Sequence, residues 1–299
     1  MTKFIISTDS CADYLKSEMN EQNIYCLPIK RIHGDKVYEE LYDKPEEFDE
    51  FYEGVKSGKL SSTSQTNPEE FLEYFNALLS EESEGDIIHI TLSSGISGTY
   101  NSAVLASNEI NEKLTNRKIY IVDSLMATVG QMMLVEKLLE LNGTIDSGKA
   151  IKIVEEMRNN QQAFFMVDDL NHLKRGGRIS ATKALLGTIL GVKPILTFNK
   201  QGKIVPCEKA KGNIKAIKTI LELAEKHKDP QNADFSKETA YIVRTSKSDS
   251  YENLKTAVIN AYPNINLKEV IVGPVVGTHL GCGGIGFVFI GKPRLDLAQ

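Results

Sequence analysis

The apolar residues in the first half of the chain follow two alternating patterns. Short apolar runs with the length of a strand occur at 3–8, 86–92 and 118–124. Between them the apolar positions return with the period of an α-helix, most clearly over 67–83, where one stripe contains Phe71, Phe75, Leu78 and Leu79. Strands that alternate with helices in this way predict a parallel sheet covered by helices on both faces.

Local signals predict where several elements begin, turn or end. Asn67 followed by Pro68 is typical of a helix start, because Asn caps the first turn and Pro fits its backbone. The segment 24–40 predicts a β-hairpin that turns at 33–35, where a glycine is flanked by polar residues. Two further helices are expected over 97–114 and 125–143.

The second half of the chain has a different pattern. Helices and strands alternate unevenly there, with strands predicted at 163–169, 193–199, 202–210, 239–245 and 286–293 and helices at 181–191, 213–228 and 250–261. We therefore expect an α/β protein of two domains: an N-terminal parallel-sheet α/β domain over 1–160 and a C-terminal α+β domain with a mixed sheet over 161–299.

Composition narrows the class of protein. The chain has 299 residues, of which 41% are hydrophobic, and its net charge of -5 argues against a nucleic-acid-binding protein. No apolar stretch approaches the roughly 18 residues that a membrane-spanning helix needs. The four cysteines are far apart, which favours free thiols in a reducing cytoplasm over a disulfide framework or a metal site. We expect a cytoplasmic protein without a metal or cofactor.

Hydroxyl residues and glycines gather in the loops where ligands of open parallel sheets bind, beyond the carboxyl ends of the strands. These loops are 8–13, 93–99 and 123–128, and the stretch 61–67 stands just before a helix start. Converging hydroxyl and backbone N–H groups form an anion site. The alternative is that each Ser or Thr only caps its own helix. Both interpretations remain open at this stage.

The loop 93–99 fits a phosphate site and a nucleophilic serine poorly. A phosphate-binding P-loop contains a lysine, and none lies between Leu92 and Glu112. The nucleophile elbow needs glycines on both sides of its serine, whereas Ser97 has Gly95 before it but Thr99 after it. No catalytic residue is therefore assigned, and a carboxylate site and simple helix caps both remain open.

Two loops in the second half carry further candidate residues. In "LKRGGRIS" (173–180), the glycine pair beside Arg178 indicates a fixed turn that directs the guanidinium inward, and simple solvation of the side chain is the alternative. In "GPVVGTHLGCGGIGF" (273–287), glycines surround His279 and would let its backbone approach a ligand closely. A purely structural role for His279 is the alternative there.

The order of these loops resembles the DegV family of bacterial fatty-acid-binding proteins. The matching stretches run over nearly the whole chain: "STDSCAD", "STSQTN", "LSSGISGTYNSA", "IVDS", "LKRGGRIS", "KPIL" and "VVGTHLGCGGIGF". The resemblance implies a two-domain protein that binds a long-chain fatty acid, with the carboxylate at the domain interface and the acyl chain in a buried tunnel. It also implies that the protein presents the acid to a separate fatty-acid kinase, which phosphorylates the carboxylate.

The resemblance also implies roles for individual residues. Thr63 and Ser94 match the residues that hold the carboxylate, and supporting roles fall to His279, Arg178, Ser64, Ser97 and Thr278. Two positions depart from the usual pattern: Thr66 and Cys282 each stand where a proline is common. Pro68 is expected to absorb the first change, and the second is expected to loosen the loop that carries His279.

Other functions remain as alternatives to a carrier protein. The same Ser and His loops could serve a lipid-ester hydrolase or a kinase of small substrates, and a scaffold protein would bind no lipid. A hydrolase needs a carboxylate that orients His279, and none lies within nine residues of it in sequence. We also expect transient membrane contact for lipid exchange. The sequence does not specify the acyl chain length, the oligomeric state or the kinase.

Overall fold

A computed structural model describes residues 3–179 and 191–297 of the chain. The chain folds into two compact units. The first unit comprises Met1–Lys44 and Thr63–Arg158, and the second comprises Pro45–Ser62 and Asn159–Gln299. The sequence predicts a single boundary at 160/161. The structure assigns 45–62 to the second unit instead, so the chain enters that unit early and returns before Thr63.

The first unit contains the predicted parallel sheet, with strand order β2-β1-β6-β7 and all pairings parallel. Its strands are β1 (Ile5–Asp9), β2 (Ile24–Leu27), β6 (Ile87–Thr91) and β7 (Ile119–Asp123). Its helices are α1 (Lys16–Gln22), α3 (Pro68–Glu81), α4 (Thr99–Asn111), α5 (Val129–Leu141) and α6 (Ser147–Asn160). The predicted α/β class is confirmed for this half of the chain.

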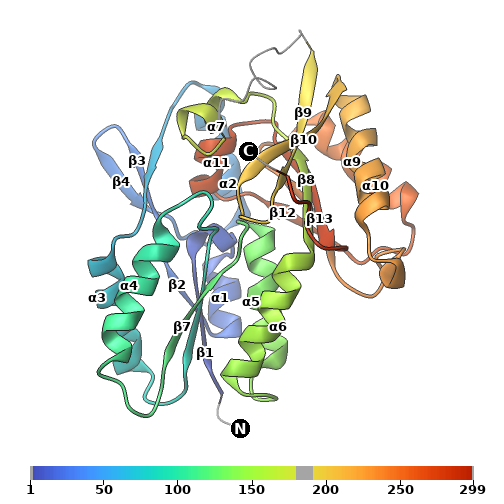
Figure 1. Ribbon diagram of the computed structural model, residues 1–299. Coiled ribbons are helices and arrows are strands. Elements are labelled where there is room, and N and C mark those ends of the chain that lie inside the picture. Colours follow the sequence, from blue (N-terminus) through green and yellow to red (C-terminus); the bar gives the residue numbers. More distant parts are fainter. Residues whose placement is uncertain (1–2, 180–190, 298–299) are drawn as a thin grey trace. The chain divides into compact units, whose positions relative to one another are not determined.

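Helices cover both faces of this sheet, as the apolar strands require. Figure 1 shows α3 and α4 on one side of the strands and α1 and α5 on the other. On the first side, Ile5 packs in one cluster with Phe71 and Phe75 of α3 and Ala103 of α4. Because neighbouring residues of a strand face opposite sides, Ile6 is buried on the other side. Burial on both faces explains why β1 and β6 lack polar alternation.

The predicted hairpin over 24–40 is correct at its turn but wrong in its first strand. The hairpin itself consists of β3 (Lys30–His33) and β4 (Lys36–Glu39), and β5 (Ser62–Ser64) lies beside β3. Ile24–Leu27 instead forms β2, which pairs parallel with β1 after the crossover helix α1. Pro28 separates the two strands, because proline lacks the N–H that a continuous strand would donate.

The second unit contains the predicted mixed sheet, with strand order β10-β9-β8-β13-β11-β12. Only the β11–β12 pairing is parallel among the pairings of this sheet that the structure describes. The strands are β8 (Gln161–Met166), β9 (Val192–Phe198), β10 (Ile204–Lys211), β11 (Ala240–Arg244), β12 (Leu267–Ile271) and β13 (Ile285–Ile290). The helices are α2 (Pro45–Lys56), α7 (Asn171–Arg175), α9 (Asn213–His227), α10 (Asp249–Ala261) and α11 (Pro274–Leu280).

An aromatic core holds the second unit together. Phe235 packs edge-on against Phe287 and Phe289 of β13, with ring centroids 5.6 and 5.0 Å apart. Apolar residues of α9 and α10 complete the same cluster.

The segment around His279 is helical. The glycine loop predicted around His279 is wrong, because residues 274–280 form α11, with Pro274 in its first turn and His279 in its last. Proline fits the start of a helix, so the segment had a helix signal that the glycines obscured.

The helix predicted over 181–191 lies almost entirely outside the described residues. In residues 3–179 and 191–297, no helix is long and apolar enough to cross a bilayer.

Candidate functional site

The loops of the first unit meet at the point where its strand order reverses. Strand β1 connects through α1 to β2 on one side, while β6 pairs with β1 on the other side. In open α/β sheets, ligands bind beyond the carboxyl ends of the strands at such a point. The Ser94 loop, residues 93–99, follows β6 at this edge, between the ends of β1 and β7.

Two aspartates at the strand ends hold the backbone on both sides of Ser94. Asp9, which ends β1, accepts hydrogen bonds from the backbone N–H groups of Leu92 at 2.8 Å and Cys11 at 3.0 Å. Asp123, which ends β7, accepts from the N–H groups of Ser94 at 3.1 Å and Leu125 at 2.9 Å. Asp9 is fully buried, and this desolvation raises the pKa of its carboxyl. The two carboxyl groups therefore fix the main chain where the loop begins.

The Ser94 loop uses most of its own N–H groups internally. Gly95 N–H donates to Ser93 Oγ at 3.0 Å, and the N–H of Ser97 donates to the Ser93 carbonyl at 3.1 Å. Thr99 N–H donates to Ser97 Oγ at 3.2 Å, and the two hydroxyls of Ser97 and Thr99 lie 2.9 Å apart. Ser97 thus stabilises the start of α4. This loop offers a ligand hydroxyl groups more readily than backbone N–H groups.

Ser94 differs from the other hydroxyl residues of this loop. Its side chain is exposed, and its hydroxyl makes no hydrogen bond within the part of the chain that the structure describes. Ser93 is buried and accepts from the loop backbone. Of the predicted pair Ser94 and Ser97, Ser94 therefore has the hydroxyl that a ligand can reach.

The stretch that carries Thr63 lies against the helix start that follows the Ser94 loop. Thr63, half-buried, and Ser64, exposed, belong to β5. The side-chain oxygen of the next residue, Gln65, lies 2.4 Å from the position that a Cβ on Gly98 would occupy. Gly98 precedes α4, so the absence of a side chain there lets Gln65 approach the helix start. The structure thus brings the 63–65 stretch and the 97–99 stretch together.

Thr66, which replaces the common proline, does not disturb this region. Thr66 is buried, and α3 begins two residues later at Pro68. The Asn67 side chain accepts from Glu70 N–H at 3.0 Å, and the Glu70 carboxylate accepts from Asn67 N–H at 2.7 Å. This capping box, together with Pro68, fixes the helix start.

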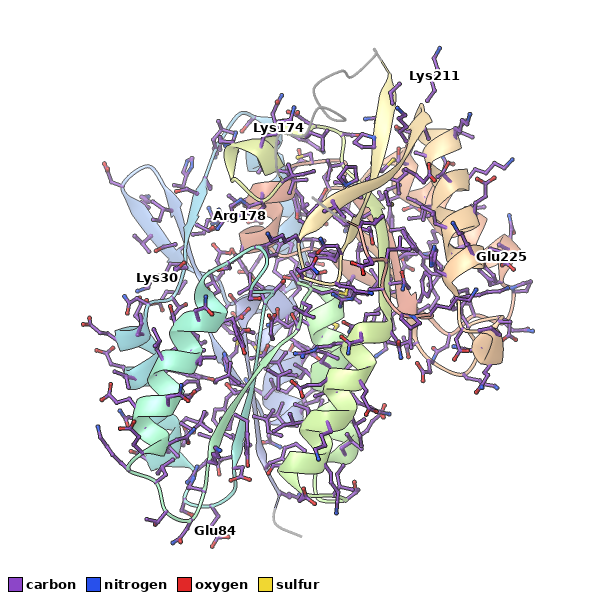
Figure 2. All side chains as sticks on the ribbon, in the orientation of Figure 1. Lys30, Glu84, Lys174, Arg178, Lys211 and Glu225 are labelled. Carbon is purple, nitrogen blue, oxygen red and sulfur yellow. The ribbon has the colours of Figure 1, made fainter. Side chains whose placement is uncertain are left out.

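In the second unit, the glycine pair before Arg178 lies against His279. A Cβ on Gly176 would be 2.2 Å from His279 Nδ1, so only glycine leaves room for the ring. Gly177 has a φ of +69°, which turns the chain toward Arg178. Arg178, labelled in Figure 2 in the loop after α7, donates a hydrogen bond from Nη1 to the Gly176 carbonyl. The two predicted supporting residues of this half are therefore neighbours.

The surroundings of His279 favour its neutral form. Burial lowers the pKa of His279 from 6.5 to about 4, and the positive charges of Arg178 and Arg175 act in the same direction. The ring is therefore neutral at pH 7, where it can donate one hydrogen bond and accept another. In this pair the arginine carries the positive charge and His279 supplies a neutral hydrogen-bonding group.

Thr278 has a role inside its own helix. Its buried side chain donates from Oγ1 to the Pro274 carbonyl at 2.8 Å, one turn earlier in α11. Ser64 makes a similar local contact, since its hydroxyl donates to the Gln65 carbonyl at 3.5 Å. The structure therefore gives both hydroxyls structural partners, and a contact with a ligand stays a prediction for each.

Sequence reasoning missed Asp9 and Asp123 as site residues. Each stands at the end of a predicted strand and before a serine, in "TDSCAD" and "VDSLMAT". An aspartate at that position accepts N–H groups of the following turn, a signal that marks the loop geometry. Within the described residues, no three His, Cys, Asp or Glu side chains gather closely enough to hold a metal ion.

Comparison with known proteins identifies close relatives of the whole chain. A family model described as "Uncharacterised protein, DegV family" matches residues 3–292. A DegV domain-containing protein of Clostridium perfringens is 34% identical, over 98% of this chain and 99% of that protein. The structure of DegV from Bacillus subtilis, a fatty acid binding protein, is 33% identical with a TM-score of 0.82, over 98% of this chain and 100% of that one. A DegV family protein of Thermus thermophilus, described by its fatty acid binding, is 26% identical with a TM-score of 0.81, over 97% and 100%.

Proposed function

The chain belongs to the DegV family, as the ordered motifs predicted, and on that premise we propose that it binds one long-chain fatty acid. Thr63 and Ser94 hold the carboxylate in this proposal, and Arg178 and His279 support it. The solved relatives from Bacillus subtilis and Thermus thermophilus, which are described as fatty acid binding, support the choice of ligand.

The observation that carries the proposal is the pairing of the motifs within each unit. The Thr63 stretch lies against the start of α4 next to Ser94, and the Arg178 loop lies against His279. One pair offers hydroxyl donors and the other offers a cation with a neutral imidazole. A single carboxylate needs a few donors and one positive charge, which these groups supply.

The energetics assign different roles to the head group and the acyl chain. Burial of an alkyl chain contributes about 0.8 kcal/mol per methylene. A hydrogen bond to a charged group contributes about 1.5–3 kcal/mol. A chain of a dozen or more methylenes therefore dominates the affinity, and the polar residues orient the carboxylate.

We further propose that the protein is a carrier and not itself an enzyme. It presents the bound carboxylate to a separate fatty-acid kinase, and this partner follows from the family resemblance of the motifs. The exposed position of Ser94 fits a role in which a second protein must reach the carboxylate.

Mass spectrometry of an organic extract tests the proposed ligand directly. Protein purified without detergent should release fatty acid at about one molecule per chain, because the buried acyl chain dissociates slowly. A matched extract of an unrelated protein from the same culture controls for lipid that adheres to the surface. Lipid at the level of that control would contradict the proposal.

The His279→Ala variant separates the carrier from the ester hydrolase. We expect about a fivefold faster loss of fatty acid, since one neutral hydrogen bond of about 1 kcal/mol is removed. Neither the variant nor the wild type should hydrolyse p-nitrophenyl esters of short acids. A hydrolase would lose its general base with His279, typically at a cost of about 10²-fold or more in rate. Turnover by the wild type that disappears in both His279→Ala and Ser94→Ala would overturn the carrier role.

A further inference from the structure

Helix α2 is the part of the second unit that lies earliest in the sequence. The segment 45–62 belongs to that unit, although the chain before and after it belongs to the first unit. After α2 the chain continues to β5, which carries Thr63. None of the motifs that indicate the carboxylate site falls on this helix, so that site does not by itself explain the contacts of α2.

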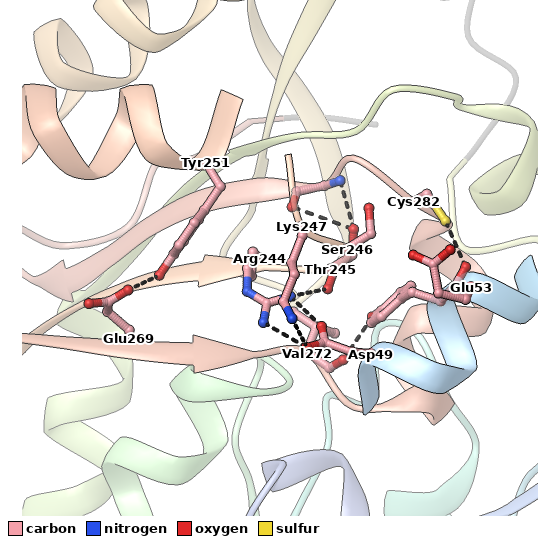
Figure 3. Close-up of polar contacts among 12 residues, drawn as sticks. Asp49, Glu53, Arg244, Thr245, Ser246, Lys247, Tyr251, Glu269, Val272 and Cys282 are labelled. Atoms are coloured by element: carbon pink, nitrogen blue, oxygen red, sulfur yellow. Dashed lines mark hydrogen bonds and ion pairs between the residues drawn. The ribbon is translucent and has the colours of Figure 1, made fainter. Parts of the chain in front are cut away.

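An ion-pair cluster holds the first half of α2 to the end of β11. Figure 3 shows dashed lines from the Arg244 guanidinium to Asp49 of α2, at 2.7 Å to one carboxylate oxygen and 3.4 Å to the other. Lys247 Nζ lies 2.9 Å from the same carboxylate. The Arg244 side chain is 11% exposed, so little solvent screens this pair.

The second half of α2 packs against α11, the helix that carries His279. Tyr52 is 1% exposed, and its hydroxyl donates to the Val272 carbonyl just before α11 at 2.7 Å. The same hydroxyl lies 2.4 Å from where a Cβ on Gly277 would stand. Cys282, just after α11, donates from Sγ to the Tyr52 carbonyl at 3.5 Å. Tyr52 therefore touches the chain before, within and after α11.

We propose that α2 sets the position of His279, with Tyr52 as the positioning residue that fixes α11. Gly277 lies two residues before His279 on the same short helix, so a displacement at Tyr52 moves the imidazole with the backbone. The His279 ring itself lies against Gly176. It fills the space that a Cβ at position 176 would need. A ring held so closely on one side responds to small shifts of its helix.

This role also explains the residue that replaces the common proline. A proline has no donor for the Tyr52 carbonyl, whereas Cys282 supplies its thiol. The sequence predicted that Cys282 loosens the chain around His279. The contact with Tyr52 instead links the end of α11 to α2. Cys282 therefore restrains this part of the chain through its side chain, where a proline would restrain it through its backbone.

Gly277→Ala and Gly54→Ala form a matched pair of tests. Both exchange a helical glycine for alanine, but a Cβ on Gly54 of α2 meets only the flexible Lys59 side chain, at 3.4 Å. Gly277→Ala forces the Tyr52 hydroxyl and α11 apart, whereas Gly54→Ala leaves both in place. Tyr52→Phe provides a third variant that keeps the packed ring and removes the hydrogen bond to Val272.

The first readout is the pKa of the His279 ring, measured by NMR on protein labelled at histidine. Other charged or titratable groups near the ring are Arg178, Arg175 and His172, which no variant changes. Displacement exposes the ring, so in Gly277→Ala its pKa should rise from about 4 toward 6.5. Gly54→Ala should keep the wild-type value. This readout needs no fatty acid.

The second readout is the dissociation rate of fatty acid from protein loaded with oleate, because the functional meaning of the inference rests on the proposed function. We expect dissociation up to about fivefold faster in Gly277→Ala, the same limit as for His279→Ala, because the same hydrogen bond is lost. Tyr52→Phe should move both readouts in the same direction by a smaller amount. If Gly277→Ala does not fold, Tyr52→Phe alone decides the outcome.

The two readouts distinguish the possible failures. An unchanged His279 pKa in folded Gly277→Ala and Tyr52→Phe overturns the positioning role, whatever the lipid does. A raised pKa with unchanged oleate dissociation, also unchanged in His279→Ala, supports the positioning role and contradicts the proposed role of His279 in the carboxylate site.

Discussion

The double variant Thr63→Ala/Ser94→Ala should lose bound fatty acid about 10²- to 10⁴-fold faster than the wild type and still fold. Both hydroxyls are expected to donate to the carboxylate, and each such bond contributes about 1.5–3 kcal/mol. Neither position is in the core, because Ser94 is exposed and Thr63 is half-buried on a short edge strand. The melting temperature of the lipid-free protein should therefore change little. Fatty-acid content after dialysis against an excess of albumin measures the effect.

Two neighbouring hydroxyls serve as matched controls. Ser62 precedes Thr63 on β5 and faces the opposite side of the strand, so Ser62→Ala should retain the fatty acid. Ser97 stabilises the start of α4 through Thr99, so Ser97→Ala should lower the free energy of unfolding by about 1 kcal/mol. Wild-type lipid content in the double variant would place the head group elsewhere in the protein.

The fold followed from the sequence where periodicity and local signals agreed. Over 67–83, a helical stripe, a cap at Asn67 and a proline at 68 all indicated the same helix, and α3 starts where they predicted. The segment around His279 shows the opposite case. Its glycines suggested a flexible loop, but Gly277 is there because Tyr52 leaves no room for a Cβ. A glycine selected for close packing looks the same in sequence as one selected for flexibility.

The site was predictable at the level of motifs but not of contacts. The loops of Ser94 and Thr63 stood out by their hydroxyl content, and the structure confirms that their neighbours Gly98 and Gln65 lie together. Which hydroxyl remains exposed depends on partners distant in sequence. Asp123 accepts from Ser94 N–H across 29 residues, while Ser97 uses its hydroxyl two residues away. Such pairings depend on strand order, which no local pattern encodes.

A buried histidine in the first unit makes the stability of the protein sensitive to acid. His89 of β6 is fully buried, and its Nδ1 lies 2.8 Å from Ser7 Oγ, which in turn lies 2.6 Å from the Tyr74 hydroxyl. The rings of Phe71 and Phe75 pack edge-on against the imidazole, with centroids 5.4 Å away in each case. Burial in this apolar setting lowers the pKa of His89 from 6.5 to about 3.

The direction of the pH dependence follows from proton binding. Above pH 6.5, His89 is neutral in the folded and the unfolded chain, so it adds no pH dependence. Between pH 6.5 and about 3, the unfolded chain binds a proton that the folded chain does not, so the free energy of unfolding falls as the pH falls. The slope is about 1.4 kcal/mol per pH unit for one proton. From pH 7.5 to 5.0, His89 alone should therefore lower the free energy of unfolding by about 2 kcal/mol.

The His89→Gln variant isolates this contribution, because glutamine can still bond to Ser7 and does not titrate. Urea unfolding at pH 7.5 and 5.0, followed by circular dichroism, gives the loss of stability for the variant and the wild type. The variant should lose about 2 kcal/mol less than the wild type over this interval, even if it is less stable at both pH values. All groups common to both proteins cancel in that difference, including Asp9, whose raised pKa acts in the opposite direction.

His279→Gln should show a smaller difference, because the His279 ring is only half-buried and solvent weakens its shift. Equal losses in wild type and His89→Gln would mean that the imidazole binds its proton inside the folded unit, with Ser7 and Tyr74 rearranged to accept it.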